Sequence, residues 1–232
     1  MPVIPARMSH RVVSEVPGRQ GSRLRDELHA FTDRRLMLFL AAMLPVLIVF
    51  FQHQAAMPLY LVGELGMSEA TYGLVFTVNT VLIILIEVPL NLWMSSWPHR
   101  RALPLGALLT AAGFGATGLV AGFPMLALTV VVWTFGEMIL LPGASAWVAE
   151  SAPAHRRGAY MGVFIMSFSV AFSSGPWLGA TVYERFGGGV LWSLVFAFGC
   201  LSTALLALIR EPPKTEPVES LRIAQDEVEA LR

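Results

Sequence analysis

Long apolar stretches alternate with short polar connectors along most of this chain. A helix needs about 20 mostly apolar residues to cross the hydrocarbon core of a bilayer, and it satisfies its own backbone hydrogen bonds there. Each stretch has about this length, so the pattern predicts one membrane-spanning helix for each. We expect six spans, at Leu36 to Leu61, Tyr72 to Trp93, Ala102 to Ala121, Met125 to Val148, Tyr160 to Tyr183 and Val190 to Ile209.

Polar tails flank this region. We therefore divide the chain into a flexible basic tail (1–35), a six-helix transmembrane bundle (36–210) and a charged tail (211–232). The first tail is either a solvated leader or a segment that lies on anionic headgroups. The composition agrees, since 55% of the residues are hydrophobic, 14% are charged and the mean hydropathy is +0.63. The sequence predicts an all-α integral membrane protein with the lipid bilayer as its surroundings.

The basic residues predict the orientation of the bundle. Lys and Arg near helix ends are retained on the cytoplasmic side. They gather in both tails and in the second and fourth connectors, which contain Arg100, Arg101, Arg156 and Arg157, whereas the other three connectors hold only Arg185. Both termini are therefore expected in the cytoplasm, which requires an even number of spans. We interpret these arginines primarily as residues that fix the topology. A second interpretation is that they form contacts at a cytoplasmic gate.

The sequence gives little support to an enzyme. Cys200 is the only cysteine and has no Cys or His partners at the spacing of a metal site. There is no glycine-rich phosphate loop, and no Ser/Lys or His arrangement of an intramembrane protease accompanies the acidic residues. We expect no enzymatic activity, no cofactor, no metal and no nucleic-acid partner.

Two carboxylates lie deep inside the expected spans. Glu87 is in the second span and Glu137 is in the middle of the fourth. An ionisable side chain at the bilayer centre costs about 2.5 to 3.5 kcal/mol on insertion scales, so both should face protein or water. They predict a proton relay or a site for a cationic group. The alternative is that each is a neutral acid that is hydrogen-bonded within the bundle.

Other polar residues at comparable depth are candidates for the same cavity. Asn79 lies two turns above Glu87, and Asn91 lies one turn below it on nearly the same face. His53 has a suitable intrinsic pKa, although a histidine beside two glutamines is more often a packing residue. The candidate set, besides the two carboxylates, is Gln52, His53, Gln54, Asn79 and Asn91.

The fifth span contains Gly175, Pro176 and Gly179 in a Gly-Pro-x-x-Gly motif. Proline removes one backbone donor, and two glycines four residues apart leave a groove for a neighbouring helix. The motif predicts a bent, closely packed helix at an interface.

These residues resemble the major facilitator superfamily (MFS) of transporters. The resemblance rests on Gly136-Glu137 with Pro142, on the loop from Ala152 to Gly158, and on Gly-Pro-x-x-Gly, which resembles the family's antiporter motif. The connector from Asn91 to Gly106 is similar to a degenerate signature loop in which Asn91 and Ser95 replace glycine and aspartate. Asp33-Arg34-Arg35 before the first span resembles the start of the seventh helix of a twelve-helix member.

By this resemblance the chain is the C-terminal half of a transporter similar to bacterial drug-efflux and small-solute antiporters, which implies a bacterial inner membrane. Transport then requires a complementary six-helix half or a second copy, since the path lies between two halves. The expected function is proton-coupled movement of a small solute by alternating access. The alternatives are a non-transporting subunit or scaffold and an inactive truncated remnant.

Overall fold

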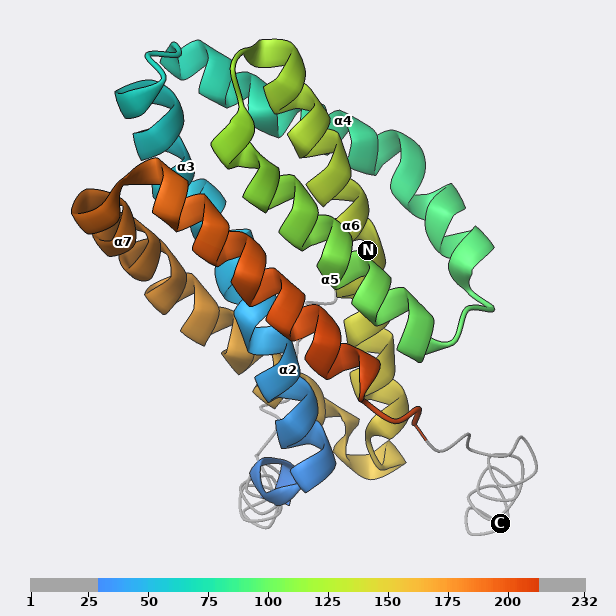
Figure 1. Cartoon of the computed structure of the whole chain (residues 1–232). Coiled ribbons are helices and arrows are strands. Elements are labelled where there is room, and N and C mark those ends of the chain that lie inside the picture. The colour runs from blue at the N-terminus through green and yellow to red at the C-terminus, as the bar shows by residue number, and fades with distance from the viewer. Residues whose placement is uncertain (1–28, 213–232) are drawn as a thin grey trace, which may run out of the picture.

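The computed structural model describes residues 29–212, and every regular element in this range is helical (Figure 1). The all-α class predicted from the sequence is confirmed. The two predicted tails, 1–35 and 211–232, lie almost entirely outside the described residues. The elements are α2 (Arg34–Phe50), η1 (Phe51–Gln54), α3 (Ala56–Pro58), η2 (Leu59–Glu64), α4 (Glu69–Met94), α5 (His99–Ala116), η3 (Thr117–Leu119), α6 (Phe123–Ser151), η4 (Ala154–Arg156) and α7 (Arg157–Ala207).

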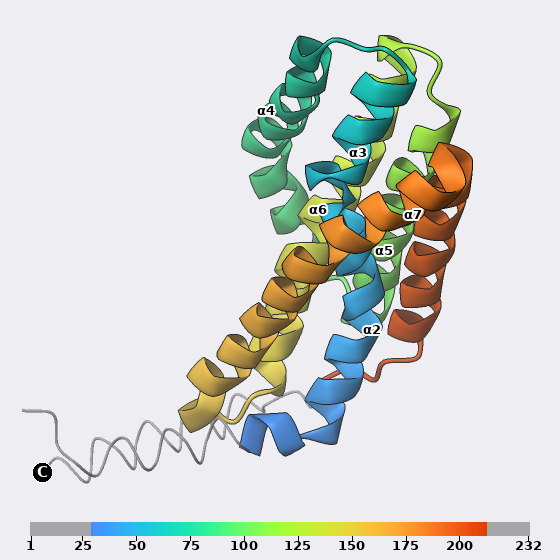
Figure 2. The same ribbon diagram turned by 90° about the vertical axis from the view of Figure 1, so that its left-hand side faces the viewer.

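The expected fifth and sixth spans both fall within α7, a 51-residue element in which two helices meet at a kink. Its backbone leaves the helical region at Gly187, where φ is +78° and ψ is 174°, a conformation that glycine adopts without a steric penalty. The chain reverses there, and Figure 2 shows the two halves of α7 (157–186 and 188–207) as separate rods. Within residues 29–212, five helical stretches are long and apolar enough to cross a membrane: Arg34–Gln54, Glu69–Met94, His99–Leu119, Phe123–Ser151 and Ala154–Ala207.

The first expected span is not one continuous helix. α2 ends at Phe50, and the chain then passes through η1, α3 and the π-helical η2 before it reaches Glu64. Ala55 interrupts the helix with φ −131° and ψ −57°. Pro58 supplies a physical reason, because a proline inside a helix lacks the N–H donor and its ring clashes with the carbonyl four residues earlier. We call residues 51–64 the irregular segment.

Glycines allow the backbones of α5, α6 and α7 to approach closely. A Cβ on Gly136 of α6 would lie 2.5 Å from the backbone nitrogen of Thr110 in α5. On the other side of α5, a Cβ on Gly199 of α7 would overlap the side chain of Ala111. Membrane helices associate largely by such close packing of small residues, since lipid provides no hydrophobic driving force. α5 is therefore the central packing helix of the bundle.

α4 is the least covered helix. It packs mainly against α6 and lies at the outside of the bundle in both ribbon views (Figures 1 and 2). Val75 and Met94 are its only buried residues, whereas Ile84 and Leu92 are 72% and 71% exposed. A large exposed apolar face of this kind suits contact with lipid or with another membrane segment.

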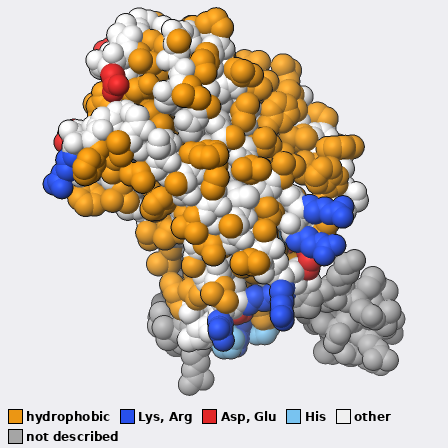
Figure 3. All heavy atoms as spheres, in the orientation of Figure 1, with side chains coloured by type: hydrophobic (Ala, Val, Ile, Leu, Met, Phe, Trp, Pro, Cys, Tyr) orange, Lys and Arg blue, Asp and Glu red, His pale blue; other side chains and the backbone are white. Residues whose placement is uncertain are grey.

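Most of the Lys and Arg side chains visible in Figure 3 lie toward one end of the bundle, and hydrophobic side chains cover its middle. The two described ends of the chain meet at this basic end. The Arg35 guanidinium donates to the backbone oxygens of Arg210 and Glu211, and the Trp147 indole N–H donates to Arg210 O at 3.4 Å. We call this the inner end and the opposite one the outer end.

Asp33 fixes the start of α2 at the inner end. Its Oδ1 accepts the backbone N–H groups of Arg35 (2.8 Å) and Leu36 (3.3 Å), and the Tyr160 hydroxyl of α7 donates to its Oδ2 (2.5 Å). Burial raises the pKa of Asp33, but these three hydrogen bonds outweigh that effect and hold the pKa below its ordinary value. This carboxylate thus caps one helix and ties it to another.

Candidate functional site

Glu137 lies in the middle of α6 and is half-buried. Its neighbour Gly136 packs against the α5 backbone at Thr110. Successive residues of an α-helix are rotated by about 100°, so Glu137 turns away from α5 and toward α4. The glycine contact therefore sets the direction in which the carboxylate points.

A hydrogen-bonded cluster joins α4 to α6 at this depth. The Asn79 amide nitrogen donates to Glu137 Oε2 at 3.0 Å and to Thr134 Oγ1 at 3.1 Å. Thr134 is fully buried, and its hydroxyl donates to Val130 O at 2.7 Å. Both N–H groups of the Asn79 amide are thus used across the boundary between the helices. We call Asn79, Thr134 and Glu137 the Asn79–Glu137 cluster.

Glu87 lies two turns from Asn79 along α4, toward the inner end. It is half-buried, and it is carried by the helix that Asn79 joins to Glu137. The Asn91 amide donates to the backbone oxygen of Glu87 at 2.8 Å, a bond within its own helix. The two helices that the Asn79–Glu137 cluster joins thus each carry one of these two carboxylates, and Asn91 bonds within the helix that carries Glu87.

His53 lies in the irregular segment, half-buried among aromatic rings. Its ring centroid is 5.0 Å from that of Phe50 and 5.8 Å from that of Phe76 of α4, both at steep angles. Its Nδ1 is 2.6 Å from Phe50 O, a geometry in which Nδ1 donates and the neutral ring keeps Nε2 as an acceptor. The Tyr72 hydroxyl donates to His53 O at 2.6 Å. The histidine is thus held on both its ring and its backbone.

The two glutamines beside His53 face opposite environments. Gln52 is 2% exposed, and its amide nitrogen donates to Ile48 O and to Gly175 O, each at 2.9 Å. Gln54 is exposed and lines an outer pocket of about 690 Å³ together with Glu69 of α4. Gln52 therefore belongs to the contact between α2 and α7, and Gln54 belongs to the outer surface.

The Gly-Pro-x-x-Gly motif lies in the first half of α7 against the irregular segment. Gly175 and Gly179 are buried, and Pro176 between them is half-buried. A Cβ on Gly175 would lie 3.2 Å from Ile48 O, and a Cβ on Gly179 would overlap Gln52 Oε1. Both glycines thus mark places where the partner segment comes too close for a side chain.

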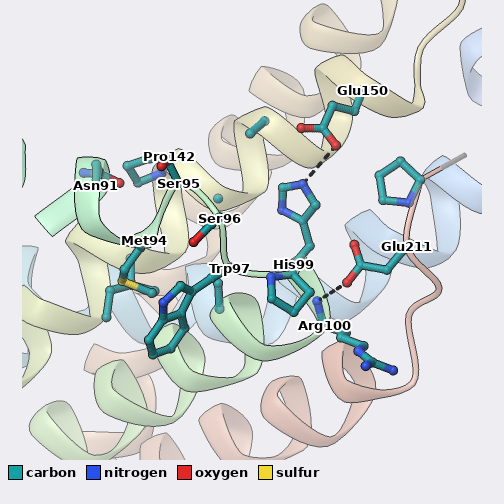
Figure 4. Close-up of a pocket in the computed structure, with 16 residues that line it drawn as sticks. Asn91, Met94, Ser95, Ser96, Trp97, His99, Arg100, Pro142, Glu150 and Glu211 are labelled. Atoms are coloured by element: carbon teal, nitrogen blue, oxygen red, sulfur yellow. Dashed lines mark hydrogen bonds and ion pairs between the residues drawn. The ribbon is translucent and has the colours of Figure 1, made fainter. Parts of the chain in front are cut away.

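A pocket of about 730 Å³ lies at the inner end, between the α4–α5 connector, α6 and the residues that follow α7 (Figure 4). His99 Nε2 lies 3.1 Å from Glu150 Oε2 across this pocket. Glu211 Oε1 accepts the backbone N–H of Arg100 at 2.8 Å in the first turn of α5. Asn91 contributes to the wall. These two polar contacts join segments that are far apart in the sequence.

The predicted loop residues all lie at the inner end, away from the Asn79–Glu137 cluster. Arg100, Arg101, Arg157 and Gly158 are exposed, and Arg156 is half-buried. Among residues 29–212, no group of three or more His, Cys, Asp and Glu side chains is arranged to hold a metal ion.

Sequence reasoning missed several polar residues that the structure places in these sites. Thr134 could have been predicted from the sequence, because it lies one turn before Glu137 on the same helical face. Tyr72, His99 and Glu211 could not, since each bonds to a segment that is distant in the sequence.

The sequence profile described as Major Facilitator Superfamily matches residues 31–229, which is most of the chain. The chain belongs to the Major Facilitator Superfamily. This MFS chain is 23% identical over 170 residues to the uncharacterized MFS-type transporter YqjV of Bacillus subtilis (strain 168), covering 71% of this chain and 41% of the relative. It is 22% identical over 184 residues to a Na(+), Li(+), K(+)/H(+) antiporter of Planococcus maritimus, covering 73% and 43%.

The fold agrees with this assignment. A crystal structure of the peptide transporter POT in complex with alafosfalin has a TM-score of 0.63 with this chain at 18% sequence identity, covering 84% of this chain and 44% of that one. At this identity the likeness shows a common fold. The MFS chain described here thus spans less than half the length of the relatives it matches. Family and hydropathy together make it an integral, multi-pass membrane protein of a transporter family.

Proposed function

We propose that this chain is one six-helix half of a secondary transporter that moves a small solute by alternating access. The Asn79–Glu137 cluster carries the proposal. A carboxylate in the middle of an apolar bundle costs about 2.5 to 3.5 kcal/mol on insertion scales, and such residues mark ion and proton pathways in membrane proteins. Family membership supports the same activity, because MFS transporters place their site near the bilayer midplane between two halves.

In this proposal the two halves of α7, on either side of Gly187, are the fifth and sixth spans. The meeting of Arg35 with Glu211 supports an even number of crossings, since both described ends then lie on one side. The excess of basic side chains at the inner end supports a cytoplasmic location for that side. Labelling of single cysteines placed at the inner end with a membrane-impermeant reagent in intact cells tests the orientation, and labelling from outside would contradict it.

Glu137 and Glu87 are the protonatable groups in this mechanism. The Asn79 amide donates a hydrogen bond to Glu137 Oε2 and so orients this carboxylate from α4. An ionised carboxylate only accepts hydrogen bonds, whereas a protonated carboxyl group both donates and accepts, so protonation of Glu137 changes this hydrogen bond. Protonation thus acts directly on the bond that holds α4 to α6. His53, with Nε2 available as an acceptor, and Gln54 at the outer pocket are the proposed polar contacts on the outer side.

The complementary unit covers the exposed apolar face of α4. This helix has few buried residues, although it carries two of the residues of the proposed site. The described helices supply one wall of the path in this proposal, and a second six-helix unit supplies the other.

Reconstitution in liposomes tests the proposal. We would combine the chain with the part of the Planococcus antiporter that lies outside the matched region and impose Na⁺ and K⁺ gradients, because this relative is named for exchange of these ions with protons. Proton movement is followed with a trapped pH-sensitive dye. The Glu137→Gln variant should insert normally but lose cation-driven proton movement. Retained movement in this variant would remove Glu137 from the mechanism.

The same experiment addresses the second candidate, a non-transporting membrane subunit. The exposed face of α4 favours this reading equally, since it suits any membrane partner. A scaffold predicts binding of the partner unit without ion-driven proton movement for any combination of halves. Stable co-purification with no flux would therefore support the scaffold over the transporter.

A further inference from the structure

Gln52 is the most buried polar side chain of the irregular segment, and only the nitrogen of its amide group is hydrogen-bonded. The nitrogen donates to Ile48 O of α2 and to Gly175 O of α7. Its Oε1 atom is buried and has no hydrogen-bond partner among residues 29–212. An unpaired buried polar atom is costly, so a side chain kept in this position needs a compensating contact.

Gly179 provides the space that this side chain fills. A Cβ built on Gly179 would overlap Gln52 Oε1 and would lie 2.7 Å from Gln52 Cδ. The next nearest atom is the Cβ of Ala56, at 3.1 Å, which also belongs to the irregular segment. The Cα–H group of a glycine is a weak hydrogen-bond donor, which accounts for an amide oxygen placed directly against it.

The first glycine of the motif acts differently. Gly175 offers its carbonyl oxygen to Gln52, and a carbonyl has two lone pairs, so it can accept this bond in addition to a helical one. Its missing Cβ makes room for the α2 backbone at Ile48 rather than for the glutamine. The two glycines thus bind opposite ends of one amide group, with Pro176 between them.

We propose that Gln52 is a positioning residue and that Gly175 and Gly179 form its socket, which fixes the irregular segment against the first half of α7. Helical hydrogen bonding is weak in this segment, because it changes from 3-10 to α to π geometry. A contact to another helix is therefore needed to define where it lies. The motif acts in this account as a rigid socket rather than as a flexible hinge.

The segment that Gln52 positions carries His53 and one wall of the outer pocket, which is lined by Gln54, Pro58 and Leu59 among others. The position of Gln52 therefore determines the shape of that pocket. This inference goes beyond the proposed transport activity and does not depend on it, because it concerns packing within this chain alone.

A double-mutant cycle between the two residues tests the socket. Gly179→Ala alone should lower the thermal midpoint of the full chain in detergent by roughly 2 to 12 °C, the range for overpacking in a chain of this size. In the Gln52→Ala background the methyl group introduced at position 179 no longer overlaps a glutamine side chain. Gly179→Ala should therefore lower the thermal midpoint by at most a third as much in that background. Equal costs in the two backgrounds would overturn the proposal.

Two further glycines provide controls. Gly162 lies in the same helix with nothing within 4 Å of its Cβ position, so Gly162→Ala should not lower the midpoint and should change it by the same amount in both backgrounds. Gly175→Ala meets Ile48 and Phe51 rather than the amide, so its cost should be the same with and without Gln52. Rescue of Gly175→Ala by Gln52→Ala would point to general loosening and would contradict the specific socket.

A distance measurement keeps the test decisive if Gly179→Ala does not fold. Spin labels are placed at Gly63 and Arg185, two exposed outer-end residues, in a Cys200→Ala background. Gln52→Met retains the bulk of the side chain but removes its donors, and it should broaden the distance distribution of this outer pair. A matched inner pair at Arg34 and Arg157 should not change. An unchanged outer distribution, or equal broadening at both ends, would refute a positioning role.

Discussion

Replacing Asn79 by leucine should loosen the contact between α4 and α6 by a calculable amount. Leucine has the same number of side-chain heavy atoms and the same branching but cannot donate, so the substitution removes the hydrogen bonds to Glu137 and Thr134. Hydrogen bonds between membrane helices contribute about 0.6 kcal/mol each on average and up to about 1.7 kcal/mol. Two lost bonds therefore reduce the free energy of unfolding by about 1 to 3 kcal/mol. Thr134→Val removes only one of them and should cost about half as much.

Titration of the purified chain from mild detergent into SDS, followed by tryptophan fluorescence, measures these differences. Asn91→Leu is the matched control, because Asn91 lies in the same helix but its amide bonds within α4. The double variant Asn79→Leu/Glu137→Gln isolates the pair, since loss of Asn79 should matter less once the carboxylate is gone. If Asn79→Leu costs no more than Asn91→Leu, the Asn79–Glu137 cluster does not hold the helices together.

Three further outcomes follow from the packing and the inner end. Gly136→Ala places a Cβ 2.5 Å from the α5 backbone and should reduce the free energy of unfolding by about 1 to 3 kcal/mol, whereas Gly162→Ala should not reduce it in the same SDS titration. Because the pKa of Asp33 is lowered in the folded chain, the stability that its carboxylate contributes is complete above its ordinary pKa of about 4 and is lost as the pH falls through the lowered value. The stability difference between the native chain and Asp33→Asn should therefore begin to shrink near pH 4 and disappear only below the lowered pKa, and a difference that stays constant across this range would contradict this. Glu211→Ala removes the side chain that caps α5 and should cost about 1 kcal/mol in the same titration, with Glu211→Gln, which keeps an acceptor oxygen, costing less.

The helical segments follow closely from hydropathy, because each must supply enough apolar length to cross the bilayer and pairs its backbone internally. The span expected at Tyr72 to Trp93 is α4, Glu69–Met94, in the structure. The interruption after Phe50 did not follow, since apolar residues resume after Gln54 and hydropathy does not record φ and ψ. The polar run from Gln52 to Gln54 and Pro58 were the local signals, and both polar residues and proline are tolerated in many membrane helices.

The sequence could predict which residues belong to the candidate site, but it could not predict which of them contact one another. Depth alone identified Glu137 and Asn79, because polar groups in an apolar helix stand out in the sequence. Which of them meet depends on how each helix is rotated, and here the rotation of α6 follows from Gly136 packing on Thr110. Gln52 illustrates the difference, because its type suggested a polar cavity whereas its amide lies between two backbones.

Unequal burial divides the bundle into two parts with different mechanical properties. α5, α6 and the second half of α7 approach one another at glycines, where their backbones leave no space to slide, whereas α4 is held mainly along one side by α6. The Asn79 amide bridges these parts with both of its donors, and a hydrogen bond weakens steeply once its atoms move out of line. A displacement of α4 by little more than an ångström would therefore break both bonds together. For this reason we expect the protonation state of Glu137 and the position of α4 to be linked, since a change in one alters the hydrogen bonds that determine the free energy of the other.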